Sequence, residues 1–195
     1  MRKIDVKVGV SNRHVHLKKS DFRVLFGDTT LEKSKDLTQP GEFASTSKVT
    51  IKTQKGIIEN VRVLGPLRSY TQVEVSKTDA FKLGINPPVR ESGDIIGSEG
   101  VTLIGPNGSI DLNEGCIIAT RHIHLTNEDV KKYGLENKKY VDVLLNGVKG
   151  GILKNVSLKI SDNYSFELHL DTDDANGHLV SQGDIASILV GECDE

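Results

Sequence analysis

Apolar and polar residues alternate with a period of two along most of this chain. The pattern is clearest at the start, where Val6, Val8 and Val10 alternate with Lys7 and Gly9. A period of two places successive side chains on opposite faces of a strand, so it predicts short β-strands. The same pattern recurs at residues 48–51, 61–63, 73–75 and 168–170. With glycine and asparagine turns between such segments, an all-β barrel or sandwich is expected.

Helical spacing is confined to three short segments. Phe22, Leu25 and Phe26 share one face of a helix over residues 18–26. The expected helices are residues 18–26, 79–84 and 126–134, the last with Thr126 as N-cap, Asp129 three residues on and Gly134 as its stop. Short helices therefore accompany the strands as caps.

Two segments of the chain are repeated. Ser11–Leu17 reads SNRHVHL, and Ala119–Leu125 reads ATRHIHL, 108 residues later. Residues 73–80 match residues 168–175 at an offset of 95, which gives Glu74 the position of His169. The repeats predict a duplicated β unit.

The repeated segments hold five of the six histidines of the chain. In a His-x-His strand both imidazoles point to the same face, at a separation that suits one metal ion. Zinc takes histidine nitrogens or a carboxylate, and catalytic zinc sites use three protein ligands. The duplication therefore predicts two quasi-equivalent three-ligand sites, His14, His16 and Glu74 in one and His122, His124 and His169 in the other.

Simpler interpretations compete with this one. A single His-x-His pair can arise by chance or serve as a hydrogen-bonded core pair, although two copies in matched contexts argue against that. Glu99 competes with Glu74 but breaks the symmetry of the duplication. Arg13 and Arg121 precede the histidine pairs and point to the opposite face, where each could neutralise a carboxylate. His178 has no repeat partner and is expected at the surface.

Composition narrows the function classes. The chain has 195 residues with a formal net charge of −2, and it shows no basic excess of the kind that nucleic-acid binders use. Its two cysteines, Cys116 and Cys193, cannot form a disulfide framework, which indicates a reducing compartment. No apolar run reaches the ~20 residues of a membrane helix, and the first residues lack a signal-peptide core. We expect a cytoplasmic protein with no nucleic-acid or membrane partner.

Open metal sites near arginines suit an anionic substrate. Arg62 and Arg68 bracket an apolar segment just before Glu74, and a guanidinium there could hold a phosphate or an acid in a bidentate way. Neither a Walker loop nor a Gly-x-Ser-x-Gly motif is present. The residues alone thus indicate a metal-dependent hydrolase, lyase or group transferase.

Four motifs in order make the chain resemble the PduL-type phosphate acyltransferases, also called phosphate propanoyltransferases or phosphotransacylases. They are VGVSNRHVHL at 8–17, GPLRSYTQVEV at 65–75, ATRHIHL at 119–125 and ELHLDTDDAN at 167–176. The resemblance implies an enzyme that interconverts acyl-CoA and inorganic phosphate with acyl phosphate and CoA. It also implies two β-barrels capped by short helices, one formed by residues 1–17 with 118–195 and the other by residues 18–117.

The resemblance also implies roles for single residues. Its two zinc ions would take the same two ligand sets that the duplication predicts, and Arg68 would bind phosphate and act in catalysis. CoA would be bound by Val10, Ser11, Asn12, Lys55, Arg62 and Asn176, with Ser92 lining the same cavity. In the implied mechanism one zinc holds the CoA sulfur as thiolate while phosphate attacks the thioester carbonyl directly. Other divalent metals also suit such ligand sets.

Some properties stay open. Family members that enter bacterial microcompartments often carry an amphipathic N-terminal extension, whereas here seven residues precede the first motif, which argues against encapsulation. The acyl chain, propanoyl or acetyl, is undetermined, and a homo-oligomer is compatible with the sequence. The competing functions are a zinc hydro-lyase, a thioesterase and a non-catalytic zinc-stabilised scaffold. An amidohydrolase barrel would need about 250 residues.

Overall fold

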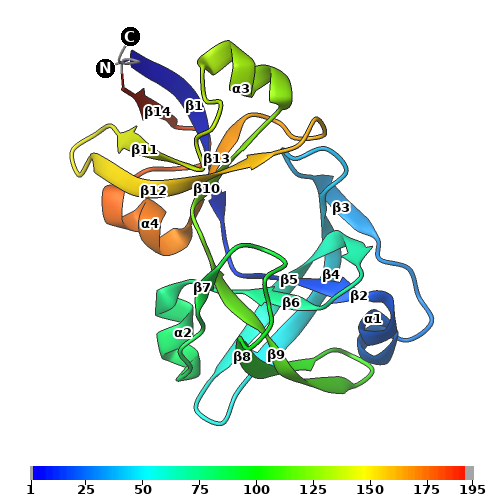
Figure 1. Cartoon of the computed structure of the whole chain (residues 1–195). Helices are drawn as coiled ribbons and strands as arrows, with labels where there is room; N and C mark the ends of the chain where they lie inside the picture. Colours follow the sequence, from blue (N-terminus) through cyan, green and yellow to red (C-terminus); the bar gives the residue numbers. More distant parts are fainter. Residues whose placement is uncertain (1, 192–195) are drawn as a thin grey trace. The chain divides into compact units, whose positions relative to one another are not determined.

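The protein is described here by a computed structural model in which residues 2–191 are placed (Figure 1). The chain divides into two compact units, residues 12–119 (unit 2) and the remainder (unit 1). The strands are β1 (Arg2–Ser11), β2 (His14–Lys18), β3 (Lys33–Asp36), β4 (Phe43–Lys52), β5 (Ile57–Arg68), β6 (Gln72–Glu74), β7 (Val89–Arg90), β8 (Glu99–Ile104), β9 (Ser109–Ala119), β10 (His122–Leu125), β11 (Tyr140–Leu145), β12 (Gly151–Ile160), β13 (Glu167–Asp171) and β14 (Ile185–Val190). The helices are α1 (Lys19–Phe26), α2 (Lys77–Leu83), α3 (Asn127–Tyr133) and α4 (Thr172–His178).

Unit 1 is a closed six-stranded barrel in the order β1-β13-β10-β12-β11-β14. Two of its pairings, β1 with β13 and β10 with β12, are parallel, and the others are antiparallel. Its interior is filled by alternate aliphatic side chains such as Val6, Ile123 and Leu168, none more than 2% exposed. The alternating pattern at the start of the chain therefore supplies one wall of a barrel built otherwise from the C-terminal half.

Unit 2 repeats this barrel. Its ring runs β9-β6-β2-β5-β4-β8, because β8 pairs with both β4 and β9 and so closes the sheet. The parallel pairs are β9 with β6 and β2 with β5, at the same places in the ring as in unit 1. The all-β fold expected from the alternating pattern is confirmed, and so are the two β-barrels that the family resemblance implies.

The strand that comes just before each histidine pair in the sequence lies in one unit, and the histidine pair itself lies in the other. β1 leads directly into β2 of unit 2, and β9 leads directly into β10 of unit 1. The chain changes unit after Ser11, before the expected boundary at residue 17, because β2 pairs with β5 and β6. The two crossings also lie 108 residues apart, as the repeat requires.

The helices are placed by short local signals. Ser76 and Thr126 cap α2 and α3 through reciprocal capping boxes with Asp79 and Asp129. The three expected helices are present, but α4 is one that the hydrophobic pattern did not predict. It lies 95 residues after α2, and its end is hard to recognise because Leu179, not glycine, takes the left-handed conformation there (φ 54°). Between residues 2 and 191 no helix is long and apolar enough to cross a membrane.

Equivalent core positions should carry equivalent stability. Leu17 and Leu125 directly follow the second histidine of each pair, and both are fully buried. We expect Leu17→Ala and Leu125→Ala each to lower the free energy of unfolding by about 2–5 kcal/mol, because each leaves a cavity. Urea unfolding followed by circular dichroism measures this, with Lys131→Ala on the exposed face of α3 as a control within about 0.5 kcal/mol of the wild type. A loss below 1 kcal/mol at either leucine would contradict the assignment of these strands to the cores.

Candidate metal and substrate site

The first histidine pair lies on β2 in unit 2. Antiparallel pairing with β6 places His14 directly opposite Glu74, and His14 Nε2 lies 3.4 Å from Glu74 Oε2. The rings of His14 and His16 have centroids 5.0 Å apart. One donor atom from each of His14, His16 and Glu74 lies within 4.8 Å of the others. The three side chains that the repeat predicted are therefore together, with two buried imidazoles and a half-buried carboxylate.

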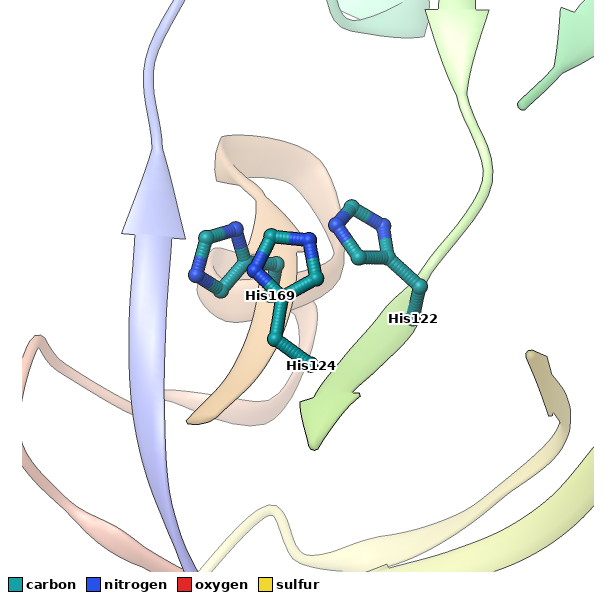
Figure 2. Close-up of side chains that lie close together, drawn as sticks. All are labelled: His122, His124 and His169. Atoms are coloured by element: carbon teal, nitrogen blue, oxygen red, sulfur yellow. The ribbon is translucent and has the colours of Figure 1, made fainter. Parts of the chain in front are cut away.

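The second cluster repeats the first in unit 1. Antiparallel pairing of β10 with β13 places His122 opposite His169, and the three rings of His122, His124 and His169 face one another (Figure 2). Their centroids are 4.5 to 5.1 Å apart, and their donor atoms again lie within 4.8 Å. Tyr164 stacks on His124 with a centroid distance of 4.2 Å, which supports the ring from one side.

Backbone contacts orient the first histidine of each pair. Nδ1 of His14 lies 2.8 Å from the carbonyl oxygen of Asn12, and Nδ1 of His122 lies 2.8 Å from that of Thr120. A carbonyl only accepts, so Nδ1 carries the proton and donates in both rings. Nε2 is then left with a lone pair in both rings, which is the state a metal ligand needs.

The second histidine of each pair is buried with an unused nitrogen. Among the described residues, Nδ1 of His16 and Nδ1 of His124 have no hydrogen-bond partner and almost no contact with solvent. A buried polar atom without a partner costs about 1–3 kcal/mol, and a bound cation would remove that cost. The same nitrogen lacks a partner at matched positions of both units, so this feature is a property of the repeated unit.

Burial keeps these rings neutral. Desolvation, followed by the charges of His14 and Arg68, holds the pKa of His16 well below its ordinary value. Desolvation also lowers the pKa of His122, with Lys159 as the next cause, and lowers the pKa of His124 to about 3. Three histidines in unit 1, and two histidines with a carboxylate in unit 2, are both ligand sets of the kind that binds zinc, so the residues fit a divalent metal in each unit.

Two buried groups that sequence reasoning missed contact the third donor of each cluster. Gln72 Nε2 donates to Glu74 Oε1 at 2.6 Å, and Glu167 Oε2 lies 2.7 Å from Nε2 of His169. Both lie two residues before that donor on its own strand, so the offset of 95 residues could have identified them. Lys159 was also missed, and it lies on β12 opposite His124. No repeat signal marks it, because Leu64 occupies the matching position in unit 2.

Arg68 lies in the same unit as the His14 cluster. It is linked to that cluster by hydrogen bonds, because the Ser92 hydroxyl that it contacts also accepts from Gln72, which donates to Glu74. Its Nη1 donates to Ser92 Oγ at 3.2 Å and Tyr70 Oη at 3.4 Å, and its Nη2 pairs with Glu42 at 3.1 Å. The structure thus places Ser92 and the His14 cluster close to the half-buried guanidinium of Arg68.

The residues expected to bind CoA are spread more widely. Arg62 lies opposite His14 on β5 and donates to the carbonyl oxygen of Ser45 at 2.6 Å. Lys55 lines a cavity of about 500 Å³ in unit 2, together with Lys52 and Gly84. The cluster residues and Arg68 are not among the residues that line that cavity.

The remaining predicted CoA contacts lie near the first crossing and on α4. Val10 and Ser11 end β1, where Val10 N donates to Gln182 Oε1 at 2.7 Å. Asn12 follows at the crossing and is exposed, as is Asn176 on α4. None of these residues belongs to either donor cluster.

The other candidate residues have structural partners. Arg13 pairs with Asp79 at 2.6 Å and Arg121 with Asp174 at 3.0 Å, which confirms that each neutralises a carboxylate of a neighbouring helix. Glu99 begins β8, where its carboxylate accepts from the backbone nitrogen of Asn86 at 3.1 Å, and it is in neither donor cluster. Cys116 is fully buried, and burial raises the pKa of its thiol to about 12, so it is unreactive. Cys193 lies outside the described residues.

Comparison with known proteins agrees with this geometry. Residues 7–181 match the family model of phosphate propanoyltransferase. A phosphate propanoyltransferase of Priestia megaterium is 52% identical over 96% of this chain and 87% of its own length. Those of Thermotoga maritima and Rhodopseudomonas palustris are 48% and 45% identical, over 93% and 94% of this chain and 88% and 81% of their own lengths.

The lowered histidine pKa values predict how stability depends on pH in the metal-free chain. The folded pKa values of His16, His122 and His124 lie below the unfolded value, so only the unfolded chain takes up protons as the pH falls. Their contribution is complete above about pH 6.5 and decreases below it, by up to about 1.4 kcal/mol per pH unit for each histidine.

We therefore expect chelator-treated protein to unfold at a lower urea concentration at about pH 5.5 than at about pH 7.5. His124→Gln should reduce this pH dependence, whereas His178→Gln, in the last turn of α4, should not. Equal pH dependence in the wild type and His124→Gln would contradict the assigned burial.

Proposed function

Because the chain belongs to the phosphate propanoyltransferase family and is therefore a phosphate acyltransferase, we propose that it transfers a short acyl group between CoA and inorganic phosphate with the help of two bound zinc ions. The reaction is acyl-CoA plus phosphate to acyl phosphate plus CoA, with acetyl or propanoyl as the acyl group. The observation that carries the proposal is the pair of matched three-donor clusters, one of them beside Arg68.

His14, His16 and Glu74 would hold one ion, and His122, His124 and His169 the other. When bound, zinc supplies a Lewis acid for the CoA sulfur or the thioester carbonyl. The unpartnered Nδ1 atoms of His16 and His124 support this assignment, since they leave a buried donor in each cluster.

Arg68 is the candidate for holding phosphate. Its planar guanidinium offers paired N–H donors that match two phosphate oxygens. In the structure these donors contact Ser92, Tyr70 and Glu42, so phosphate would exchange with neutral hydroxyls and one carboxylate. Held in this way, a phosphate oxygen attacks the thioester carbonyl carbon, the C–S bond breaks, and CoA leaves as thiolate. The positive guanidinium also stabilises the developing oxyanion.

No side chain is required as a covalent acyl carrier. Cys116 is buried with a raised pKa, and neither donor cluster contains a cysteine. We therefore propose direct transfer. Parallel-line initial-rate kinetics, or an isolated acyl-protein, would oppose it.

For the CoA moiety we propose contacts with Val10, Ser11, Asn12, Lys55, Arg62 and Asn176. The cationic groups Lys55 and Arg62 suit the phosphates of CoA, and Lys55 lines an existing cavity. Ser92 is proposed as a neighbour of the CoA site because its hydroxyl accepts a hydrogen bond from Arg68.

The activity is tested by release of the CoA thiol from acetyl-CoA and propanoyl-CoA, followed colorimetrically with purified protein. We expect release that requires phosphate and stops after chelation, and the two rates rank the two acyl groups. Release without phosphate would show a thioesterase. Absence of release from metal-replete protein would refute the transferase proposal.

Arg68→Ala should separate phosphate binding from metal binding. We expect it to lower phosphate-dependent turnover by about 10²- to 10³-fold, because a charged donor to the reacting oxygens is lost. Metal content, measured by elemental analysis, should be unchanged, and Arg68→Lys should recover only part of the activity because lysine lacks the paired donors. Arg23→Ala, which removes an exposed arginine paired with Asp28, is the matched control. Full activity in Arg68→Ala would contradict the assignment.

A further inference from the structure

Each donor cluster has one buried polar neighbour at the same place. Gln72 in unit 2 and Glu167 in unit 1 lie two residues before the third donor, on β6 and β13. Gln72 is 0% exposed and Glu167 is 4% exposed. Strand register places Gln72 opposite His16 and Glu167 opposite His124, so both side chains lie at the histidine pair.

The chemistry of each neighbour complements that of the donor it contacts. Glu74 is a carboxylate that only accepts when ionised, and its neighbour Gln72 offers an amide N–H at 2.6 Å. His169 can donate from its ring, and its neighbour Glu167 offers a carboxylate oxygen at 2.7 Å. A contact of this kind fixes the ring nitrogen that is protonated, so Nδ1 of His169 keeps its lone pair.

The chain also makes room for Glu167. Gly9 on β1 lies opposite His169, and a Cβ atom at this position would lie 2.8 Å from Cδ of Glu167. A side chain at this position would therefore require the carboxylate of Glu167 to shift from its present place beside His169. At the equivalent place in unit 2, Ile117 lies opposite Glu74, where the neighbour is Gln72.

Gln72 connects its metal donor to the phosphate candidate. Besides Glu74, its Nε2 donates to Ser92 Oγ at 2.8 Å, and its Oε1 accepts from the backbone nitrogen of Gly93 at 2.7 Å. Ser92 Oγ also accepts from Arg68. The buried amide of Gln72 therefore contacts both the carboxylate of Glu74 and the turn at Ser92 and Gly93, which Arg68 also contacts.

We propose that Gln72 and Glu167 are matched positioning residues that orient Glu74 and His169 for their metal ions. The inference rests on the metal sites proposed above. It further assigns one carboxylate to each site: Glu74 within the donor set of unit 2, and Glu167 directly behind the donor set of unit 1. Two sites with different third ligands thereby present the same charge to a divalent ion.

The test is competition for zinc between the protein and a chromophoric chelator, which reports the affinity of each bound ion. Gln72→Leu and Glu167→Leu keep a side chain of similar size but remove the hydrogen bond to Glu74 or His169. We expect each to weaken one of the two ions by about 10- to 100-fold and leave the other unchanged, as for other residues that support metal ligands. Circular dichroism confirms folding. Ser45→Ala and Ser187→Ala each remove a buried hydroxyl contact in the same units and should change neither ion.

Milder variants at the unit 1 site separate position from packing. Glu167→Gln retains an oxygen acceptor and should recover most of the affinity lost in Glu167→Leu. Gly9→Ala leaves Glu167 in the chain but displaces its carboxylate, so it should weaken the same ion as Glu167→Leu. Unchanged affinity in Gly9→Ala and Glu167→Leu would overturn the role of Glu167.

An exchange of the two motifs tests the complementarity directly. His169→Glu alone places a second carboxylate beside Glu167, whereas Glu167→Gln with His169→Glu converts unit 1 to the Gln-x-Glu arrangement of unit 2, for which Gly9 leaves room. We expect the double variant to bind its zinc at least tenfold more tightly than His169→Glu alone. Equal binding by the two would overturn the inference.

The experiment distinguishes failure of the proposed metal sites from failure of the proposed positioning role. A wild-type chain that does not bind two zinc ions refutes the proposed sites, and the inference with them. Two ions in the wild type, with unchanged affinities in both leucine variants, refute the positioning role alone.

Discussion

The antiparallel register between each histidine strand and its neighbour is the constraint on which the rest of the structure depends. It places His14 opposite Glu74 and His122 opposite His169, and so turns three separate side chains into one donor set. A shift of one residue would turn the His-x-His pair toward the opposite face of the sheet. The buried residues between the histidines, Val15 and Ile123, prevent such a shift because each fills the core of its barrel.

Burial links this register to chemistry. The desolvation that disfavours charged imidazole keeps His16, His122 and His124 neutral, and each keeps a lone pair. The same burial makes every unsatisfied nitrogen costly, which explains why backbone carbonyls hold His14 and His122. A bound metal ion would remove the free-energy cost that burial imposes on the unpartnered nitrogens of His16 and His124.

Much of this could be predicted from the repeat, because duplication converts two weak signals into one strong one. The equivalence of Glu74 and His169 is an example, since neither residue alone identifies itself as a partner of a histidine pair. Residues that lack a repeat counterpart were harder to find. Lys159 corresponds to the apolar residue Leu64 in unit 2. Helix α4 is followed by Leu179, whereas α2 is followed by a glycine. The strand exchange after Ser11 depends on which strands pair, and periodicity carries no information about pairing partners.

The predicted CoA contacts show a further limit of the sequence. Arg62 lies beside His14 through strand pairing, whereas Lys55 lines a separate cavity and Asn176 lies on the exposed part of α4. Their proposed common role depends on one long ligand. No pattern of alternation could have shown this, because it follows from the ligand and not from the local chain.

The central claim is that the duplication builds two metal sites of one design. Crystals of the zinc-saturated protein, with diffraction data collected on both sides of the zinc absorption edge, test it most directly. We predict two anomalous peaks per chain, one among His14, His16 and Glu74 and one among His122, His124 and His169. A single peak, or peaks away from these side chains, would contradict the account.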